Sequence, residues 1–164
     1  MRDLASGSRD ALADLYDAHA ASLFRHAMAL TRRTADAEDL VATVFLKLAT
    51  TGAELLGVRS PAAYLHRMVS TTWLDAQRRA AVADRHAPAA AADTPMPGVP
   101  GDSIDVTRAL DALPAAQRQA VVLHVVEGFS FREVGRATGV SLFTAAARYR
   151  LAIARLRQIL RRTT

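Results

Sequence analysis

The sequence contains no cysteine and no long hydrophobic run, and each absence excludes a class of protein. Without cysteine the chain forms neither disulfides nor thiolate sites, which suits a reducing cytoplasm. No stretch approaches the ~20 consecutive apolar residues that a membrane-spanning helix needs. The first ten residues, MRDLASGSRD, also lack the apolar core of a signal peptide. We therefore expect a cytoplasmic protein that does not insert into a membrane.

Motifs for catalysis, cofactor binding and metal binding are also missing. There is no glycine-rich phosphate loop, no HExxH zinc motif and no nucleophile elbow. Asp36, Glu38 and Asp39 lie close together, but no ligands recur elsewhere at a matching spacing. The five histidines are scattered along the chain, at positions 19, 26, 66, 86 and 124. We interpret His26 and His124 as hydrogen-bonded or exposed histidines rather than as metal ligands. The sequence predicts a protein that is not an enzyme and needs no cofactor.

The composition favours helices over strands. Hydrophobic residues make up 51% of the chain, but many are alanine, and aromatic residues make up only 5%. Alanine has the highest helix propensity, whereas strands are enriched in β-branched and aromatic residues. We therefore predict an all-α fold.

The spacing of apolar residues and helix caps places seven helices. Apolar positions at i, i+3, i+4 and i+7 mark each one, and Ser or Ser-Pro pairs precede several. Residues 50–59 contain two glycines and are predicted to form a loop. The predicted helices cover about residues 9–31, 35–49, 61–85, 103–113, 114–127, 131–138 and 142–162.

A linker divides the predicted helices into two small domains. Residues 87–102, APAAAADTPMPGVPGD, hold four of the six prolines and two glycines. If extended, they span roughly 50 Å, which leaves domains 1–86 and 103–164 free to sit apart. The second domain is strongly basic, with ten arginines and four acidic residues. This part of the chain is expected to bind a polyanion.

The segment from Gly128 to Arg162 has the pattern of a helix-turn-helix. Ser130 and Glu133 have the spacing of a capping box, and Gly139 suits the left-handed turn that ends a short helix. Ser141 then caps a second, arginine-rich helix. Such a pair places its second helix in the DNA major groove. A helical hairpin within an ordinary bundle is the alternative interpretation.

The order of four segments resembles the bacterial RNA polymerase sigma factors of the extracytoplasmic-function (ECF) type. The resemblance extends from about Ala11 to Leu160. The segments are DAEDLV with TVFL at 36–46, SPAAYLHR at 60–67, LDAQRR at 74–79, and LPAAQR with EGFSFREV at 113–134. Each is weak alone, but their order across a proline-rich linker is specific.

The resemblance implies an initiation factor that binds core polymerase and opens promoter DNA. The helix from Asp36 to Lys47 would dock on the coiled coil of the β′ subunit through Asp36, Glu38, Asp39, Leu40, Thr43 and Lys47. The helix from Pro61, with the 50–59 loop, would open and recognise the downstream element through Arg67, Thr71, Asp75, Arg78 and Arg79. The helix-turn-helix domain would contact the β flap and recognise the upstream element through Ser141, Phe143, Thr144, Arg148, Arg150 and Arg155. Relatives are commonly inhibited by an anti-sigma factor, and an active factor would be associated with the nucleoid.

Two surfaces depart from the family pattern. Relatives usually begin the recognition helix with Gly-Thr-Val-Lys-Ser-Arg, whereas this chain has Phe143-Thr-Ala-Ala-Ala-Arg148. Ser70 and Thr71 stand where Arg and Asn are common, and both are expected on the exposed face of the 61–85 helix that would meet the downstream element. Either the promoter is unusual, or DNA binding is weak and a partner compensates. Two alternative functions therefore stay open: a sigma-like protein that titrates an anti-sigma factor or polymerase, and a helix-turn-helix regulator.

Overall fold

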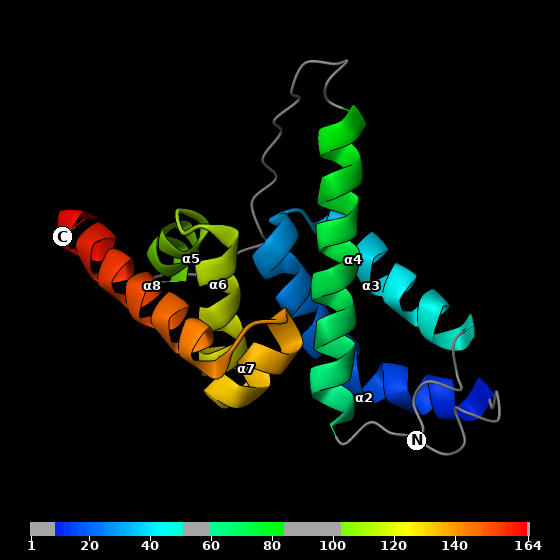
Figure 1. Cartoon of the computed structure of the whole chain (residues 1–164). Coiled ribbons are helices and arrows are strands. Elements are labelled where there is room, and N and C mark those ends of the chain that lie inside the picture. The colour runs from blue at the N-terminus through cyan, green and yellow to red at the C-terminus, as the bar shows by residue number, and fades with distance from the viewer. Residues whose placement is uncertain (1–8, 51–59, 84–102, 164) are drawn as a thin grey trace.

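The computed structural model describes residues 9–50, 60–83 and 103–163, and within these ranges all regular structure is helical. Helix α4 (Pro61–Ala83) stands at the centre of Figure 1. Helix α2 (Arg9–Thr31) crosses it, α3 (Thr34–Thr50) lies on one side, and α5 to α8 (residues 103–163) lie on the other. We call α2 to α4 the front half and α5 to α8 the rear half. The prediction of an all-α fold is confirmed.

The front half is a three-helix unit made of α2 (Arg9–Thr31), α3 (Thr34–Thr50) and α4 (Pro61–Ala83). Its core forms where the apolar stripes of the three helices meet, and Leu23, Val44 and Leu65 are completely buried there. Arg32 has a positive φ of 62° and makes the tight turn between α2 and α3. The short turn forces these two helices to pack along each other.

The rear half contains α5 (Ser103–Asp111), α6 (Ala115–Val121), a π-helical turn η3 (Val122–Val126), α7 (Phe131–Thr138) and α8 (Leu142–Thr163). Alanines at positions 120, 137, 145 and 152 are all buried between these helices. Small side chains allow close helix packing, so a compact core forms with few large residues. The His124 ring stacks on Phe131 at 4.2 Å and meets the edge of Tyr149 at 4.9 Å between ring centroids.

The helix-turn-helix is formed by α7 and α8 and has the predicted caps. The Ser130 side chain accepts from the Glu133 backbone N–H, and the Glu133 carboxylate accepts from the Ser130 backbone N–H at 2.9 Å. Gly139 adopts φ 74° at the end of α7. A Cβ on Gly135 would lie 2.7 Å from the Val140 carbonyl oxygen, so only glycine allows the turn to approach α7 this closely.

The front and rear halves are in contact. Helix α4 packs against α7, and α2 packs against α6 and η3. The sequence predicted that the linker leaves the two units free to sit apart, and it contained no indication of this contact. The division into domains 1–86 and 103–164 stays a prediction.

Some local predictions need correction or fall outside the described residues. Ser70 was expected on the exposed face of its helix, but it is only 3% exposed and faces the rear half. Ala76 is exposed, because α4 extends beyond the core at that point. Thr50, placed in the predicted loop, is the last residue of α3. The rest of that loop and the linker lie outside the described residues.

None of the helices in the described ranges combines the length and hydrophobicity needed to cross a bilayer.

Replacing Gly135 with alanine should destabilise the rear half, because the new methyl group would collide with backbone at Val140 and Ser141. Overpacking of this kind costs about 1–3 kcal/mol. Urea unfolding followed by circular dichroism should show this loss. The matched control is Arg136→Ala at the next, exposed position, which should change stability by less than about 0.5 kcal/mol. Equal stability of both variants would contradict the tight turn.

Candidate functional site

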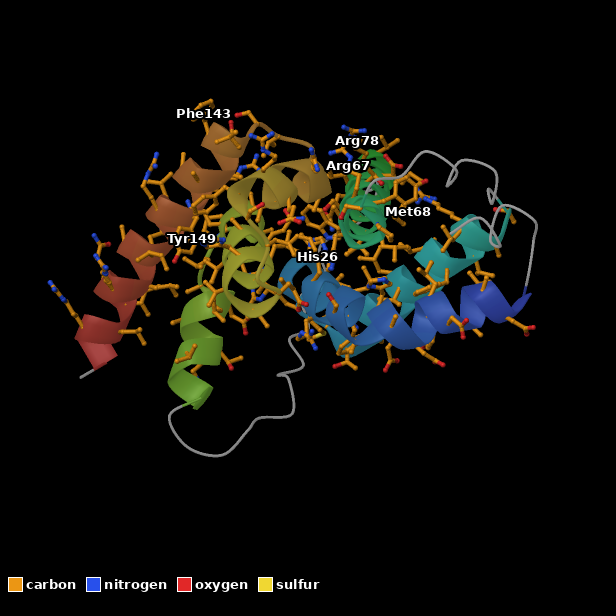
Figure 2. The ribbon with its side chains drawn as sticks, turned by 90° about the horizontal axis from the view of Figure 1, so that it is seen from below. His26, Arg67, Met68, Arg78, Phe143 and Tyr149 are labelled. Carbon is orange, nitrogen blue, oxygen red and sulfur yellow. The ribbon has the colours of Figure 1, made fainter. Side chains whose placement is uncertain are left out.

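The first turn of α8 is exposed at the edge of the molecule. The Ser141 Oγ accepts from the Thr144 backbone N–H at 3.1 Å and lies 3.0 Å from the Thr144 hydroxyl. These two predicted DNA contacts therefore also cap the helix. Phe143 is 77% exposed and projects outward (Figure 2). An aromatic side chain thus stands free at the end of the helix that enters the groove in helix-turn-helix proteins.

The predicted arginine contacts lie further along α8. Arg150 and Arg155 are exposed, and Arg148 is half-buried. Ala145 and Ala152 are fully buried against the rest of the rear half, and Arg148, three residues after the first and four before the second, borders this packed face. The helix therefore has one packed face and one free face, and the free face is basic.

The predicted residues for the downstream element lie along α4 but not in one environment. The Thr71 hydroxyl donates to the Arg67 and Met68 carbonyl oxygens at 3.0 and 3.1 Å. Asp75 forms an exposed ion pair with Arg78 at 3.6 Å, and Arg79 Nε donates to the Asp75 carbonyl at 3.2 Å. The outer turns of α4 thus present a solvated, charged surface.

Arg67 lies apart from that surface, in contact with the rear half. Its guanidinium occupies the place where a Cβ on Gly139 would stand, with Nη1 only 1.5 Å from that position. Any side chain at Gly139 would displace it. Arg67 therefore packs on the turn of the helix-turn-helix, and Figure 2 shows it nearer the centre of the molecule than Phe143.

The predicted docking residues occupy the start and outer face of α3. Asp36, Glu38 and Asp39 are exposed, and Asp36 pairs with Arg33 at 3.6 Å. Leu40 is only 7% exposed and belongs to the front core. The acidic start of the helix is thus available to a partner.

Thr43 and Lys47 are tied to their surroundings. Thr43 donates to the Asp39 carbonyl at 2.8 Å, and the Lys47 ammonium donates to Thr72 of α4 at 3.0 Å. A groove between α3 and α4 is lined by residues from two of the predicted sets. Arg79 belongs to the set for the downstream element, and the others belong to the docking set: Asp36, Asp39, Leu40 and Thr43. Trp73 also lines this groove and packs on the core.

A chain of hydrogen bonds joins the front and rear halves. We call it the seam network. Its members are polar or charged side chains from α2, α4, α6 and the residue after η3: Ser22, Arg25, His26, His66, Ser70, Gln119 and Glu127.

Gln119 crosses between the halves at the centre of the seam network, and Glu127 crosses at its outer end. The Gln119 amide nitrogen lies 2.7 Å from His26 Nε2 and donates to Ser70 Oγ at 2.8 Å. The Ser22 hydroxyl donates to the Glu127 carboxylate at 2.6 Å. Gln119 and His26 are each 5% exposed or less, so these bonds form away from solvent. Buried polar groups are costly without partners, so the two halves satisfy each other here.

The proton positions in the network follow from this geometry. Because the Ser22 proton goes to Glu127, Ser22 Oγ accepts from His66 Nε2 at 2.9 Å. Nδ1 of His66 is then unprotonated and accepts from His26 Nδ1 at 2.9 Å. Nε2 of His26 in turn accepts from Gln119. Both rings are therefore neutral, and an added proton would place two donors face to face.

The electrostatics of the histidines agree with this assignment. Burial lowers the pKa of His66 from 6.5 to about 4. The negative charge of Glu127 opposes this shift by raising the pKa, whereas His19 and Arg25 lower it further. Burial, with the neighbouring His66, also holds the pKa of His26 well below its ordinary value. Both shifts have the direction that desolvation produces.

Glu127 is charged and paired at the outer end of the network. Burial opposes its charge, but hydrogen bonds from Arg25 and Ser22 outweigh that effect and lower its pKa. Arg25 Nε donates to Glu127 Oε1 at 2.6 Å and Nη2 donates to Oε2 at 3.0 Å. This bidentate geometry is the strong form of an ion pair.

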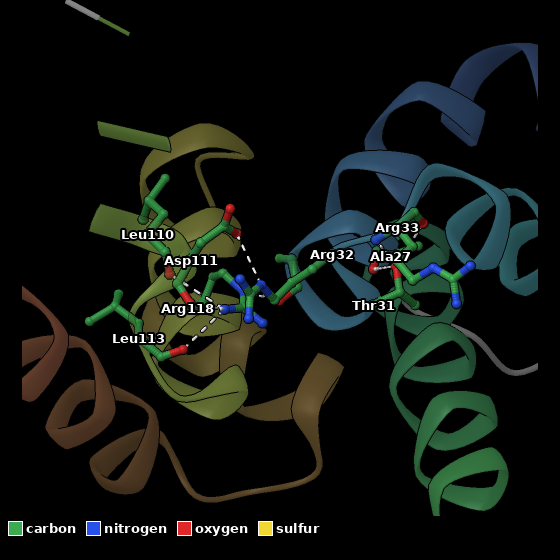
Figure 3. A network of polar contacts seen from close by, with 9 residues as sticks. Ala27, Thr31, Arg32, Arg33, Leu110, Asp111, Leu113 and Arg118 are labelled. Atoms are coloured by element: carbon green, nitrogen blue, oxygen red, sulfur yellow. Dashed lines mark hydrogen bonds and ion pairs between the residues drawn. The ribbon is translucent and has the colours of Figure 1, made fainter. Parts of the chain in front are cut away.

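A second link between the halves is made by Arg118 of α6 (Figure 3). Its Nε donates to the Ala29 carbonyl near the end of α2, and its Nη1 donates to the Leu113 carbonyl at 3.0 Å and the Asp111 carbonyl at 3.2 Å. Carbonyls near a helix C-terminus attract cations. Beside it, Arg32 pairs with Asp111 at 3.4 Å across the same seam.

The seam network was not predicted from the sequence, although one signal was present. His26 lies three residues after Leu23 and four before Leu30, on the apolar stripe of α2. His66 stands between the core residues Leu65 and Val69 in the same way. A polar residue on a buried stripe needs a partner, but the sequence does not say that the partner comes from the other half.

Stability should fall between pH 6.5 and 4.5, because the unfolded chain binds protons that the neutral buried histidines do not. For His66, whose pKa is lowered to about 4, the loss is on the order of 2 kcal/mol from pH 7 to 5, and the lowered pKa of His26 acts in the same direction. Glu127 and Glu133 have pKa values below 4.5, so their stabilisation is lost only in more acidic solution. Urea unfolding at pH 7.5, 6.0 and 5.0 measures the slope.

The variant His66→Gln should have a flatter pH dependence than the wild type, whatever its stability at pH 7.5. An unchanged slope would contradict burial of the neutral ring.

Comparisons with known proteins agree with this geometry. The Sigma-70 region 2 family model matches residues 15–82, and the Sigma-70, region 4 model matches residues 103–156. The RNA polymerase sigma factor CarQ of Myxococcus xanthus is 32% identical over 98% of this chain and 95% of its own length. The ECF RNA polymerase sigma factor SigM of Mycobacterium tuberculosis is 31% identical over 94% of this chain and 80% of its own length.

Two solved structures share the fold. One is the sigma factor RpoE in complex with the anti-sigma factor NepR from Bartonella quintana, with a TM-score of 0.70, 24% identity, and coverage of 85% of this chain and 90% of that one. The other is CnrH in complex with the cytosolic domain of CnrY, with a TM-score of 0.74, 22% identity, and coverage of 99% and 96%. The two family models and the full-length relatives together establish that this chain belongs to the ECF RNA polymerase sigma factors.

Proposed function

We propose that this ECF sigma factor, which directs promoter-specific transcription initiation, binds core polymerase through α3 and recognises the promoter through α4 and α8. The observation that carries the assignment is the free basic face of α8 in a helix-turn-helix, within the same chain as an exposed acidic α3. Core polymerase, through its β′ coiled coil and β flap, and promoter DNA are the proposed partners. The factor acts in initiation without a covalent step of its own, in the cytoplasm and at the nucleoid.

We propose the front and rear halves as separate domains, 1–86 and 103–164, with 87–102 as their linker. In the structure Arg67 of the downstream set packs on Gly139 in the helix-turn-helix. While that contact persists, Arg67 is not available to DNA. Binding of both promoter elements therefore requires the seam to open.

Regulation by an anti-sigma factor is also proposed. RpoE and CnrH, which share this fold, were solved with NepR, an anti-sigma factor, and with CnrY. A partner of this kind would act on this chain by favouring the closed arrangement of its two halves. A protein that titrates such a partner without recognising a promoter is the second candidate, and the free Phe143 and the missing polar residues at 146 and 147 favour it.

Transcription with purified core polymerase tests the proposal. The full chain should bind core and start transcripts from a subset of a genomic promoter library, scored by start site. Binding to core with no transcript at any promoter would leave only the titrating protein. No binding to core would contradict the initiation factor and leave only a protein that titrates an anti-sigma factor.

Within that assay, Asp39→Arg should weaken the complex with core about tenfold or more, because it reverses an exposed charge of the docking surface. The matched control is Asp10→Arg, an equal charge reversal on the exposed first turn of α2. Native-gel titration with core gives both affinities. Equal loss in the two variants would mean that only net charge matters.

The variant Arg150→Ala should weaken promoter binding by the holoenzyme and lower the slope of log affinity against log salt by about one, if Arg150 contacts a phosphate. Fluorescence anisotropy at several salt concentrations measures it. An unchanged slope with a changed base preference would instead place Arg150 on a base edge.

A further inference from the structure

The free face of α8 carries an apolar stripe. Phe143 is 77% exposed and Leu151 is 58% exposed, with the half-buried Ala147 between them. Residues at i, i+4 and i+8 lie on one side of a helix. The buried Ala145 and Ala152 lie on the other side, so the stripe faces away from the protein.

Arginines border the stripe on both sides. Arg150 and Arg157 lie along one side by helical spacing, and Arg148 and Arg155 lie along the other. The three along the outer part, at 150, 155 and 157, are exposed. An apolar strip between two rows of cations suits a partner that is apolar along its middle and anionic at its edges.

Major-groove DNA has this combination where it contains thymine. Phosphates line both edges of the groove, and the C5-methyl group of thymine is the apolar feature on its floor. Alanine and phenylalanine side chains make apolar contacts with that methyl group. The side chains of Ala146 and Ala147 cannot form a hydrogen bond to a base, so at these two positions the helix can make only apolar side-chain contacts.

We infer that Phe143, Ala147 and Leu151 select thymine methyl groups in the upstream promoter element. The inference rests on the proposed promoter recognition by α8 and names the base feature that it selects. Phe143 stands in the first turn, where recognition helices contact base edges. The flanking arginines supply phosphate contacts that hold the helix in register without selecting a sequence.

Replacing thymine with deoxyuridine removes the methyl group and keeps base pairing, so it isolates this contact. The holoenzyme of the full chain with core polymerase first selects upstream sites from a duplex library randomised in that element. The best site is then remade with deoxyuridine at each thymine in turn. Wild-type holoenzyme should lose about fourfold in affinity at one or more positions, the effect expected for one buried methyl group.

The variant Phe143→Ala should bind the thymine and deoxyuridine sites with equal affinity at one of those positions. The variant Leu151→Ala should do so at another position. The control is Val125→Ala, which removes an equally exposed apolar side chain from η3 and should keep every difference. Circular dichroism verifies that each variant is folded.

Several results overturn the inference. Selected sites without thymine, or equal affinity for thymine and deoxyuridine at every position, exclude recognition of the methyl group. Normal promoter selectivity in Phe143→Ala would leave the stripe as a contact for a protein. If the library yields no enriched site and no transcript, the proposed promoter recognition fails instead, which is a distinguishable outcome.

Discussion

The allocation of protons along the seam network is the constraint on which the arrangement of the two halves depends. From Gln119 through His26 and His66 to Ser22 and Glu127, each donor has one acceptor. This order exists only while both imidazoles are neutral. A network with every member satisfied specifies one geometry, whereas a partly satisfied one is worse than an apolar contact. The halves are thus held in one particular relation.

The same constraint connects the structure to promoter recognition. Closure places Arg67 of α4 on the turn at Gly139, while the first turn of α8 with Phe143 stays free. One of the two proposed recognition surfaces is therefore partly covered, and the other is not. A sigma factor in this state could meet an upstream element before its downstream surface is complete, and the network would separate as a unit when the second element is engaged.

Much of the fold could be predicted from the sequence because its signals are local. The capping box at Ser130, the turn at Gly139 and the start of α4 at Pro61 each depend on residues within one helical turn, and the structure has them as expected. The apolar stripes likewise placed the front core. The seam could not be predicted in this way. Ser70 was placed on a solvated face, because its partner Gln119 is 49 residues away and no local pattern joins them.

The candidate site was foreseen in part for the same reason. Family resemblance supplied the three sets of residues, and the structure describes their surroundings without testing their roles. Leu40 lies in the front core, and Ser141 and Thr144 cap α8. A sequence motif cannot show that a residue also has a structural role, because it gives residue types but not what each side chain contacts.

The π-helical turn η3 has a consequence for how the seam is encoded. Its wider hydrogen bond, from the Glu127 N–H to the Val122 carbonyl, accommodates one residue more than an α-helical turn. In an unbroken α-helix Gln119 and Glu127 would point in directions about 80° apart. The extra residue takes up most of that difference, so both side chains reach α2 in the front half. The backbone of η3 therefore makes Gln119 and Glu127 point in similar directions. Removing one residue from η3 would turn them apart without altering either side chain.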